Sequence, residues 1–315
     1  MVSRRFLRIK TMQALYAYNA NPKANIAVAE ADLLKSVRGC YELFLWLFAV
    51  LPEIAFYRTK KLDSLKEKYN PTEEDLNPNT KFVDNKVIRQ IENNKELVHL
   101  WPKYHIKWED ETDLIAKLFH EIEQLPEYEV YMTGRENDYQ EDKKFVLMVI
   151  EKVFAGNDLL HWYLGEKNTH WIDDYDEAMM MFYQNVKEFK EIKGDECRID
   201  SLYKSNEDEL FCKQLFRKTI EHEAEYTGLI EEKLQNWELE RVINLDMLLM
   251  QMALAELLEF PQIPIKVTLN EYIEMAKWYS SDKSKVFING ILDRLIVDLR
   301  DSGRLVKTGR GLYQN

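Results

Sequence analysis

Residues 263–295 read IPIKVTLNEYIEMAKWYSSDKSKVFINGILDRL, and this stretch predicts two helices joined by a short polar turn. Pro264 stands just before the first helix, where its fixed φ and missing N–H do no harm. Ser281 or Asp282 can cap the second helix. Apolar side chains recur at helical spacing in both segments. They are Leu269, Tyr272, Ile273 and Ala276 in the first helix, and Val286, Phe287 and Ile291 in the second.

A glycine, Gly290, lies within the predicted second helix. Glycine costs a helix interior about 1 kcal/mol relative to alanine. Such a cost usually accompanies the close approach of another backbone or of a ligand. We therefore expect a close neighbour at Gly290.

The rest of the chain has the same helical character. Hydrophobic residues make up 46% of its 315 residues, with only 10 glycines and 8 prolines. No stretch shows sustained apolar–polar alternation with turn signals, so a sheet is not expected. The sequence therefore predicts an all-α fold. Before the pair above, the predicted helices span residues 3–18, 28–68, 83–99, 111–124, 140–155, 174–192, 207–235 and 238–259.

The N-terminal sequence MVSRR lacks the apolar region of a signal peptide. The most apolar run, residues 43–56, is interrupted by Pro52 and Glu53 and is too short to span a bilayer. We expect it to form a buried helix. The three cysteines are far apart and form no CxxC pair, which suits free thiols in a reducing compartment. The prediction is a cytoplasmic protein without a membrane partner.

Charge is unevenly distributed along the chain. The net charge is −12, which by itself argues against nucleic acid as a partner. The first ten residues, however, contain Arg4, Arg5, Arg8 and Lys10 and no acidic residue. The C-terminal tail, residues 301–315, is also basic. Because a protein that is acidic overall can still present a local basic patch, the ends of the chain remain candidates for phosphate binding.

Signals for catalysis or metal binding are absent from the sequence. It contains no GxxxxGK[ST], GxGxxG, GxSxG or HExxH motif. One ExxH pair, Glu96 and His99, falls short of the two such motifs that a carboxylate di-iron bundle needs. The acidic run at residues 173–177 lacks an EF-hand loop and fits the first turn of a helix. We expect neither an enzyme nor a cofactor or metal site.

Four segments, in this order along the chain, resemble the NusB family of transcription antitermination factors. They are SRRFLRIKTMQALYAY (3–18), WELERVINLDMLLMQMALAELL (237–258), VTLNEYIEMAK (267–277) and VFINGILD (286–293). The resemblance covers roughly residues 3–20 and 206–298. It implies a helical bundle built from the N-terminal helix (1–20) and the C-terminal helices (206–300), followed by the basic tail. Residues 21–205 would then be a helical insertion of unknown role.

The resemblance also implies a site for boxA-type single-stranded RNA. The residues concerned lie in the first helix and in the turn before the last one, and are Arg4, Arg5, Arg8, Lys10, Tyr16, Asp282, Lys283, Ser284, Lys285 and Phe287. Guanidinium groups bind phosphates bidentately, and aromatic rings stack on bases. The arginines can equally be interpreted as a solvated helix end that binds nothing. Tyr16 can equally be interpreted as an aromatic residue of the core. Lys283 stands where several family members have an acidic residue.

A protein partner is implied in the same way. Tyr16, Glu240 and Asp246 fall where family members face the small-subunit ribosomal protein NusE. That partner is basic, so acidic side chains would orient its docking. Taken without the resemblance, these acids indicate only an ordinary polar helix face.

Two functions follow from these patterns. The first is a transcription antitermination factor that joins RNA, NusE and the transcription elongation complex on rRNA operons. The second is a helical scaffold or protein-interaction protein that binds no RNA. An rRNA methyltransferase with a NusB-like domain is excluded, because no glycine-rich βαβ unit is present.

Overall fold

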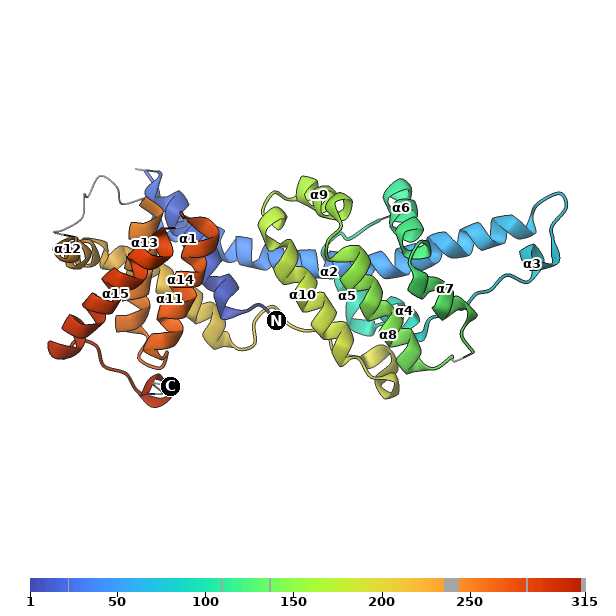
Figure 1. Cartoon of the computed structure of the whole chain (residues 1–315). Coiled ribbons are helices and arrows are strands. Elements are labelled where there is room, and N and C mark those ends of the chain that lie inside the picture. Colours follow the sequence, from blue (N-terminus) through green and yellow to red (C-terminus); the bar gives the residue numbers. More distant parts are fainter. Residues whose placement is uncertain (22, 109, 136, 235–243, 282, 313–315) are drawn as a thin grey trace. The chain divides into compact units, whose positions relative to one another are not determined.

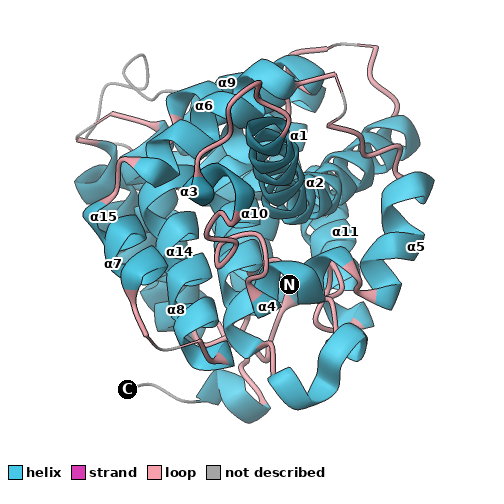
Figure 2. Cartoon of the chain, turned by 90° about the vertical axis from the view of Figure 1, so that its right-hand side faces the viewer, coloured by secondary structure: helices cyan, strands magenta, loops and turns pink. Residues whose placement is uncertain are grey.

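The computed structural model describes residues 1–21, 23–108, 110–135, 137–234, 244–281 and 283–312 (Figure 1). Every regular element among them is a helix, and Figure 2 draws no strand in this part of the chain. The all-α prediction is confirmed. The elements are α1 Arg4–Asn19, α2 Ile26–Lys66, α3 Glu73–Leu76, α4 Lys86–Glu92, α5 Lys95–Lys103, α6 Thr112–Glu123, α7 Pro126–Thr133, α8 Tyr139–Val149, η1 Ile150–Phe154, α9 Asp158–Lys167, α10 Trp171–Glu188, η2 Glu191–Glu196, α11 Asn206–Glu221, α12 Glu223–Lys233, α13 Asn244–Glu259, α14 Ile265–Tyr279, α15 Ser284–Asp301 and η4 Gly309–Leu312.

The chain forms two compact units. The bundle unit consists of Ser3–Val37 and Tyr203–Asn315, and the insertion unit of Met1–Val2 and Arg38–Leu202. The chain therefore passes from one unit to the other inside α2, after Val37. The sequence placed this boundary earlier, at the end of the first helix.

In the bundle unit, α1 packs against α11 and α13, and α13 also contacts α14 and α15. Ser3 caps α1 by accepting a hydrogen bond from the Phe6 amide (3.1 Å). Almost the whole described surface of α13 is buried, from Leu248 to Leu257, because helices cover it on several sides. The predicted bundle of the N-terminal helix with the C-terminal helices is confirmed.

Two predicted helices are interrupted in the structure. The helix expected at 207–235 breaks at His222, whose φ and ψ of −109° and 14° separate α11 from α12. The helix expected at 83–99 breaks where the Asn94 side chain accepts hydrogen bonds from the amides of Glu96 and Leu97 and starts α5. Such a cap competes with the continuing helix for the same donors. Hydrophobic periodicity cannot detect these breaks, since it persists across them.

Helix α2 is the core of the insertion unit. It runs through Pro52, although proline lacks the N–H that would bond the carbonyl of Phe48. The segment before Pro52 is buried at 0–8% exposure from Leu43 to Leu51, and the Phe48 ring meets those of Phe182 (4.7 Å) and Phe189 (6.1 Å). Packing of this apolar face thus maintains the helix through Pro52, in agreement with the single helix predicted at residues 28–68.

By length and composition α2 is also the one described helix able to cross a membrane. Its most apolar window is, however, 67% buried inside the protein. A core helix passes the same test, and the burial favours that interpretation.

Elsewhere in the insertion unit, α8 continues the expected 140–155 helix but ends in a π-helical turn, η1. Three short helices of this unit, α3, α7 and α9, were not predicted from the sequence. Their start signals are present in the sequence, with Thr72 as the N-cap of α3, Pro126 at the first position of α7 and Asn157 as the N-cap of α9.

The environment of Gly290 differs from the expectation. A Cβ built on Gly290 meets no described atom within 4 Å, so no backbone of the described chain approaches it. At Gly311, by contrast, a Cβ would lie 2.0 Å from the carbonyl oxygen of Pro261.

We predict that Gly290→Ala raises the free energy of unfolding by about 0.5–1 kcal/mol, because alanine restricts the unfolded chain and fits the helix. Gly311→Ala, the matched control for a crowded glycine, should lower it. Urea denaturation followed by circular dichroism measures both. Destabilisation by Gly290→Ala would contradict the open environment.

Candidate nucleic-acid interface

The first two arginines of α1 lie at the surface of the bundle unit. The Arg5 guanidinium forms a bidentate pair with Glu271 of α14, at 2.8 and 2.9 Å. Arg4 donates from Nε to Asp208 of α11 (3.1 Å). Their side chains keep 50% and 41% exposure, so both can reach a ligand by exchanging a carboxylate for a phosphate.

Arg8 does not share this position. Its side chain is only 3% exposed, and its Nε and second terminal nitrogen donate to both oxygens of Glu256 at 2.7 and 2.8 Å. Burial alone would lower the pKa of Arg8, but the charge and hydrogen bonds of Glu256 raise it well above its ordinary value. The prediction that Arg8 faces RNA is therefore corrected. If Arg8 moved to a ligand, the carboxylate of Glu256 would remain buried without a counter-charge.

The same correction applies to Lys10. The residue is 2% exposed, and its ammonium lies over the Phe6 ring, 5.5 Å from the centroid. The basic cluster predicted from residues 4–10 thus divides in the structure. Two of its members are at the surface and two are inside the bundle unit.

The turn between α14 and α15 presents a second set of cations. Lys283 and Lys285 are exposed, whereas Phe287 is half-buried. Ser284 is buried and donates to Asp246 (2.7 Å), so it fixes the turn and is not available to a ligand. Asp282 lies outside the described residues.

A tryptophan in the same region was not singled out from the sequence. Trp278 of α14 is 80% exposed. It follows Glu271 by seven residues, so the two share a helix face roughly 10 Å apart along the axis. The Arg5 pair and the Trp278 ring thus lie along one face of α14. Its exposure distinguishes Trp278 from a core residue. The helical pattern of the sequence does not predict whether a single tryptophan is exposed.

Together these side chains provide two kinds of contact. Arg4, Arg5, Lys283 and Lys285 offer cations to phosphates, and Trp278 offers an open ring on which a base can stack. Glu271 lies among these cations and contributes a negative charge. Burial alone would raise its pKa, but the hydrogen bonds of Arg5 and the charge of Arg8 lower it, so the carboxylate is ionised at neutral pH.

The acidic residues predicted to meet a protein partner are placed differently from the expectation. Asp246 is 4% exposed and accepts hydrogen bonds from Ser280 and Ser284. It joins the start of α13 to the α14–α15 turn, and it cannot serve as an exposed docking charge. Glu240 lies outside the described residues.

Tyr16, the third predicted partner residue, is 54% exposed. It lines an open cavity of about 280 Å³ together with Asn19, Glu223, Met247 and Gln251, among others. Glu223 is exposed and adds a negative charge beside this ring. Glu223, at the start of α12, is a second residue, after Trp278, that was not singled out from the sequence.

Nothing in the described ranges indicates a metal centre, since no three His, Cys, Asp or Glu side chains there are grouped to hold an ion. The cysteines Cys40, Cys197 and Cys212 are free and buried.

Comparisons with known proteins identify the bundle. The NusB family model matches residues 176–297. The transcription antitermination protein NusB of Salinibacter ruber is 46% identical over 102 residues, which is 32% of this chain and 64% of that protein. Its counterpart from Chloroherpeton thalassium is 41% identical over 102 residues, or 32% and 48% of the two chains. The NusB protein of Bacillus subtilis is 35% identical over 92 residues, 29% of this chain and 70% of that protein.

The chain therefore covers less than two thirds of the first two relatives. No solved structure matches it significantly.

We predict that Arg8→Met lowers the free energy of unfolding by about 3–5 kcal/mol, because Glu256 then stays buried without its cation. The matched control is Arg5→Met, on the same helix and also paired with a glutamate. Its pair is half-exposed, so the loss should be below about 1 kcal/mol. Equal effects of the two substitutions in urea denaturation would refute the structural role of Arg8.

Asp246→Ala should lower the free energy of unfolding by about 1–3 kcal/mol, since the buried Ser284 hydroxyl and the partly buried Ser280 hydroxyl lose their acceptor. Asp293→Ala on the surface of α15 serves as a control and should change it by less than about 0.5 kcal/mol. Thermal denaturation compares the two variants. An Asp246 variant as stable as the control would restore the picture of an exposed docking carboxylate.

Proposed function

This chain belongs to the NusB family, and from that premise we propose that it is a transcription antitermination factor. In this proposal its bundle unit binds boxA-type single-stranded RNA together with the ribosomal protein NusE, in the cytoplasm and during rRNA transcription. The chain acts by binding, without catalysis. The proposal is supported most by one arrangement, in which exposed cations and an exposed tryptophan lie around one helix, α14.

This arrangement suits a single strand. Aromatic stacking accepts any base, while cations follow the backbone. Glu271, the partner of Arg5, and Trp278 are separated by roughly 10 Å along α14, a span that neighbouring nucleotides of an extended strand can bridge. Lys283 and Lys285 follow at the end of the same helix.

In the free protein Arg5 is engaged by Glu271. A phosphate must therefore compete with a carboxylate for the guanidinium, and the site would bind weakly until both the stacking and the lysine contacts form. This competition favours a strand with several simultaneous contacts over an isolated phosphate.

For the protein partner we propose the surface around Tyr16. The exposed ring, the adjacent Glu223 and the open cavity beside α13 together offer an aromatic anchor with a negative charge. A basic ribosomal protein is complementary to that charge. Asp246 has no direct part in this surface, because it is buried.

The alternative is a helical scaffold that binds no RNA. The ion pairs of Arg4 and Arg5 favour it, since they satisfy these cations within the protein. The exposed Trp278 ring argues against it, because the ring shares α14 with the partner of Arg5, and single-strand binding sites combine aromatic rings with cations.

We predict that Trp278→Ala weakens binding of a boxA-type RNA by about 10-fold, since one stacked base contributes about 1–3 kcal/mol. The slope of log affinity against log salt should stay unchanged, because no phosphate contact is lost. Arg4→Ala with Arg5→Ala should instead reduce that slope by about 1.4.

Fluorescence anisotropy with a labelled oligonucleotide measures both quantities. Trp162→Ala, which removes a tryptophan that is 62% exposed in the insertion unit, is the control and should bind as the parent does. Absence of RNA binding by the parent protein, even at low salt, would favour the scaffold.

A further inference from the structure

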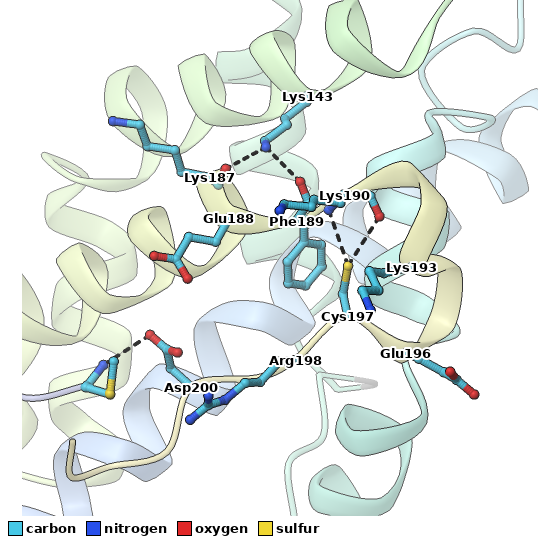
Figure 3. A pocket seen from close by; sticks show the side chains of 11 residues that line it. Lys143, Lys187, Glu188, Phe189, Lys190, Lys193, Glu196, Cys197, Arg198 and Asp200 are labelled. Atoms are coloured by element: carbon cyan, nitrogen blue, oxygen red, sulfur yellow. Dashed lines mark hydrogen bonds and ion pairs between the residues drawn. The ribbon is translucent and has the colours of Figure 1, made fainter. Parts of the chain in front are cut away.

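The insertion unit contains an open cleft of about 540 Å³ beside the C-terminal end of α10 (Figure 3). Most of its lining comes from one stretch, KEFKEIKGDECRID, at residues 187–200. Lysines recur in it at every third position and an arginine follows, so that the cleft is lined by Lys187, Lys190, Lys193 and Arg198. All four residues are exposed. In a chain of net charge −12, such a concentration of cations is local.

The acids of the cleft form ion pairs with other groups, although the charge of Lys193 helps to lower the pKa of Glu196 after the larger effect of Lys95. Among the described residues, no carboxylate forms an ion pair with any of the four. Glu196 is instead paired with Lys95 at 2.7 Å, and Asp200 with the Met1 amino group at 3.4 Å. Of the lining acids, only Glu188 has no such pair in the described ranges. The cleft therefore carries an excess of unpaired positive charge.

A fifth cation, Lys143, has a structural position. Its ammonium donates to the carbonyl oxygens of Lys187 and Phe189 (2.8 Å for the latter), and so covers the end of α10. Figure 3 shows it turned toward these oxygens, whereas the Lys187 side chain extends away from it. Burial lowers the pKa of Lys143, and the charge of Lys190 adds to this effect.

The segment that carries the cations is held in place by buried amides. Gln90 of α4 donates to the carbonyls of Lys190 (3.1 Å) and Gly194 (2.7 Å). Asn94, which is fully buried, donates to the carbonyl of Cys197 (2.7 Å). Gly194 has a φ of +49°, which glycine adopts readily. The cations are thus displayed on a preorganised loop, and binding loses less entropy than on a mobile tail.

We propose that this cleft binds the phosphodiester backbone of a nucleic-acid strand, as a second contact that needs no particular base sequence. The chemistry favours phosphates over an acidic peptide. A peptide interface depends on apolar anchors in pockets, but the one aromatic side chain of the lining, Phe189, is 2% exposed. Backbone phosphates need only cations, and a guanidinium such as that of Arg198 binds them bidentately. The proposal goes beyond the boxA site on the bundle unit and does not require it.

The test uses the full chain and a fluorescently labelled 20-nucleotide poly(U) as the probe. Lys187→Gln, Lys190→Gln and Lys193→Gln are combined in one cleft variant. The matched control combines Lys103→Gln, Lys107→Gln and Lys117→Gln, three exposed lysines of the same unit outside the cleft. Both variants lose three positive charges, so an effect of net charge alone appears equally in each.

We expect the cleft variant to reduce the magnitude of the slope of log affinity against log salt by about 2, while the control leaves it near that of the parent. Glu188→Gln should strengthen binding severalfold, because it removes the unpaired carboxylate of the cleft. A gain of affinity is an outcome that damage to the fold does not produce. Circular dichroism and thermal denaturation verify that each variant is folded.

Two results would overturn the proposal. One is a parent protein that does not bind poly(U) at low salt, and the other is equal slopes for the cleft and control variants. Failure of the proposed boxA function would be seen in a different measurement. In that case boxA-type RNA binding would not change with Trp278→Ala or with the Arg4 and Arg5 substitutions. The two proposals can therefore fail independently.

Discussion

The bundle unit depends on a buried ion pair between residues 248 positions apart, Arg8 and Glu256. It joins the N-terminal helix α1 to α13, and Thr268 and Tyr272 of α14 donate to the same carboxylate at 2.8 and 3.3 Å. Burying two charges costs several kcal/mol per ion, and only good geometry with further hydrogen bonds repays this. Here the pairing is bidentate and the carboxylate receives two hydroxyl donors. The network thus favours one registration of α1, α13 and α14 over others.

This constraint determines which cations are left at the surface. Because the Arg8 side chain points into the bundle, Arg4 and Arg5 of the same helix lie at its edge, with Arg5 against α14. A second buried carboxylate, Asp246, fixes the α14–α15 turn through Ser280 and Ser284. Lys283 and Lys285 are exposed in consequence. The candidate interface is thus positioned by charged groups that do not themselves reach a ligand.

Much of the fold could be predicted from the sequence, because helix formation and amphipathic periodicity are local. The positions of α1, α6, α14 and α15 follow from caps and apolar spacing within a few residues. The candidate site was less accessible to prediction. Arg8, Lys10 and Asp246 look like surface charges, and their burial is decided by partners such as Glu256 that lie far away in the chain. Trp278 poses the reverse problem, since its exposure depends on which neighbouring helices leave it uncovered.

The net charge of −12 does not prevent either unit from binding a polyanion. At physiological ionic strength, exposed charges are screened beyond about 8 Å, so a phosphate responds mainly to the groups immediately around it. In the insertion-unit cleft these are the unpaired lysines and Arg198, and in the bundle unit Arg5 and the lysines of the turn. Screening weakens as salt is lowered, and the acidic remainder of the chain then repels the strand from a greater distance. The acidic excess therefore opposes non-specific, long-range attraction most strongly at low salt. Binding is then confined to places where the cations have no carboxylate partner or can exchange that partner for a phosphate.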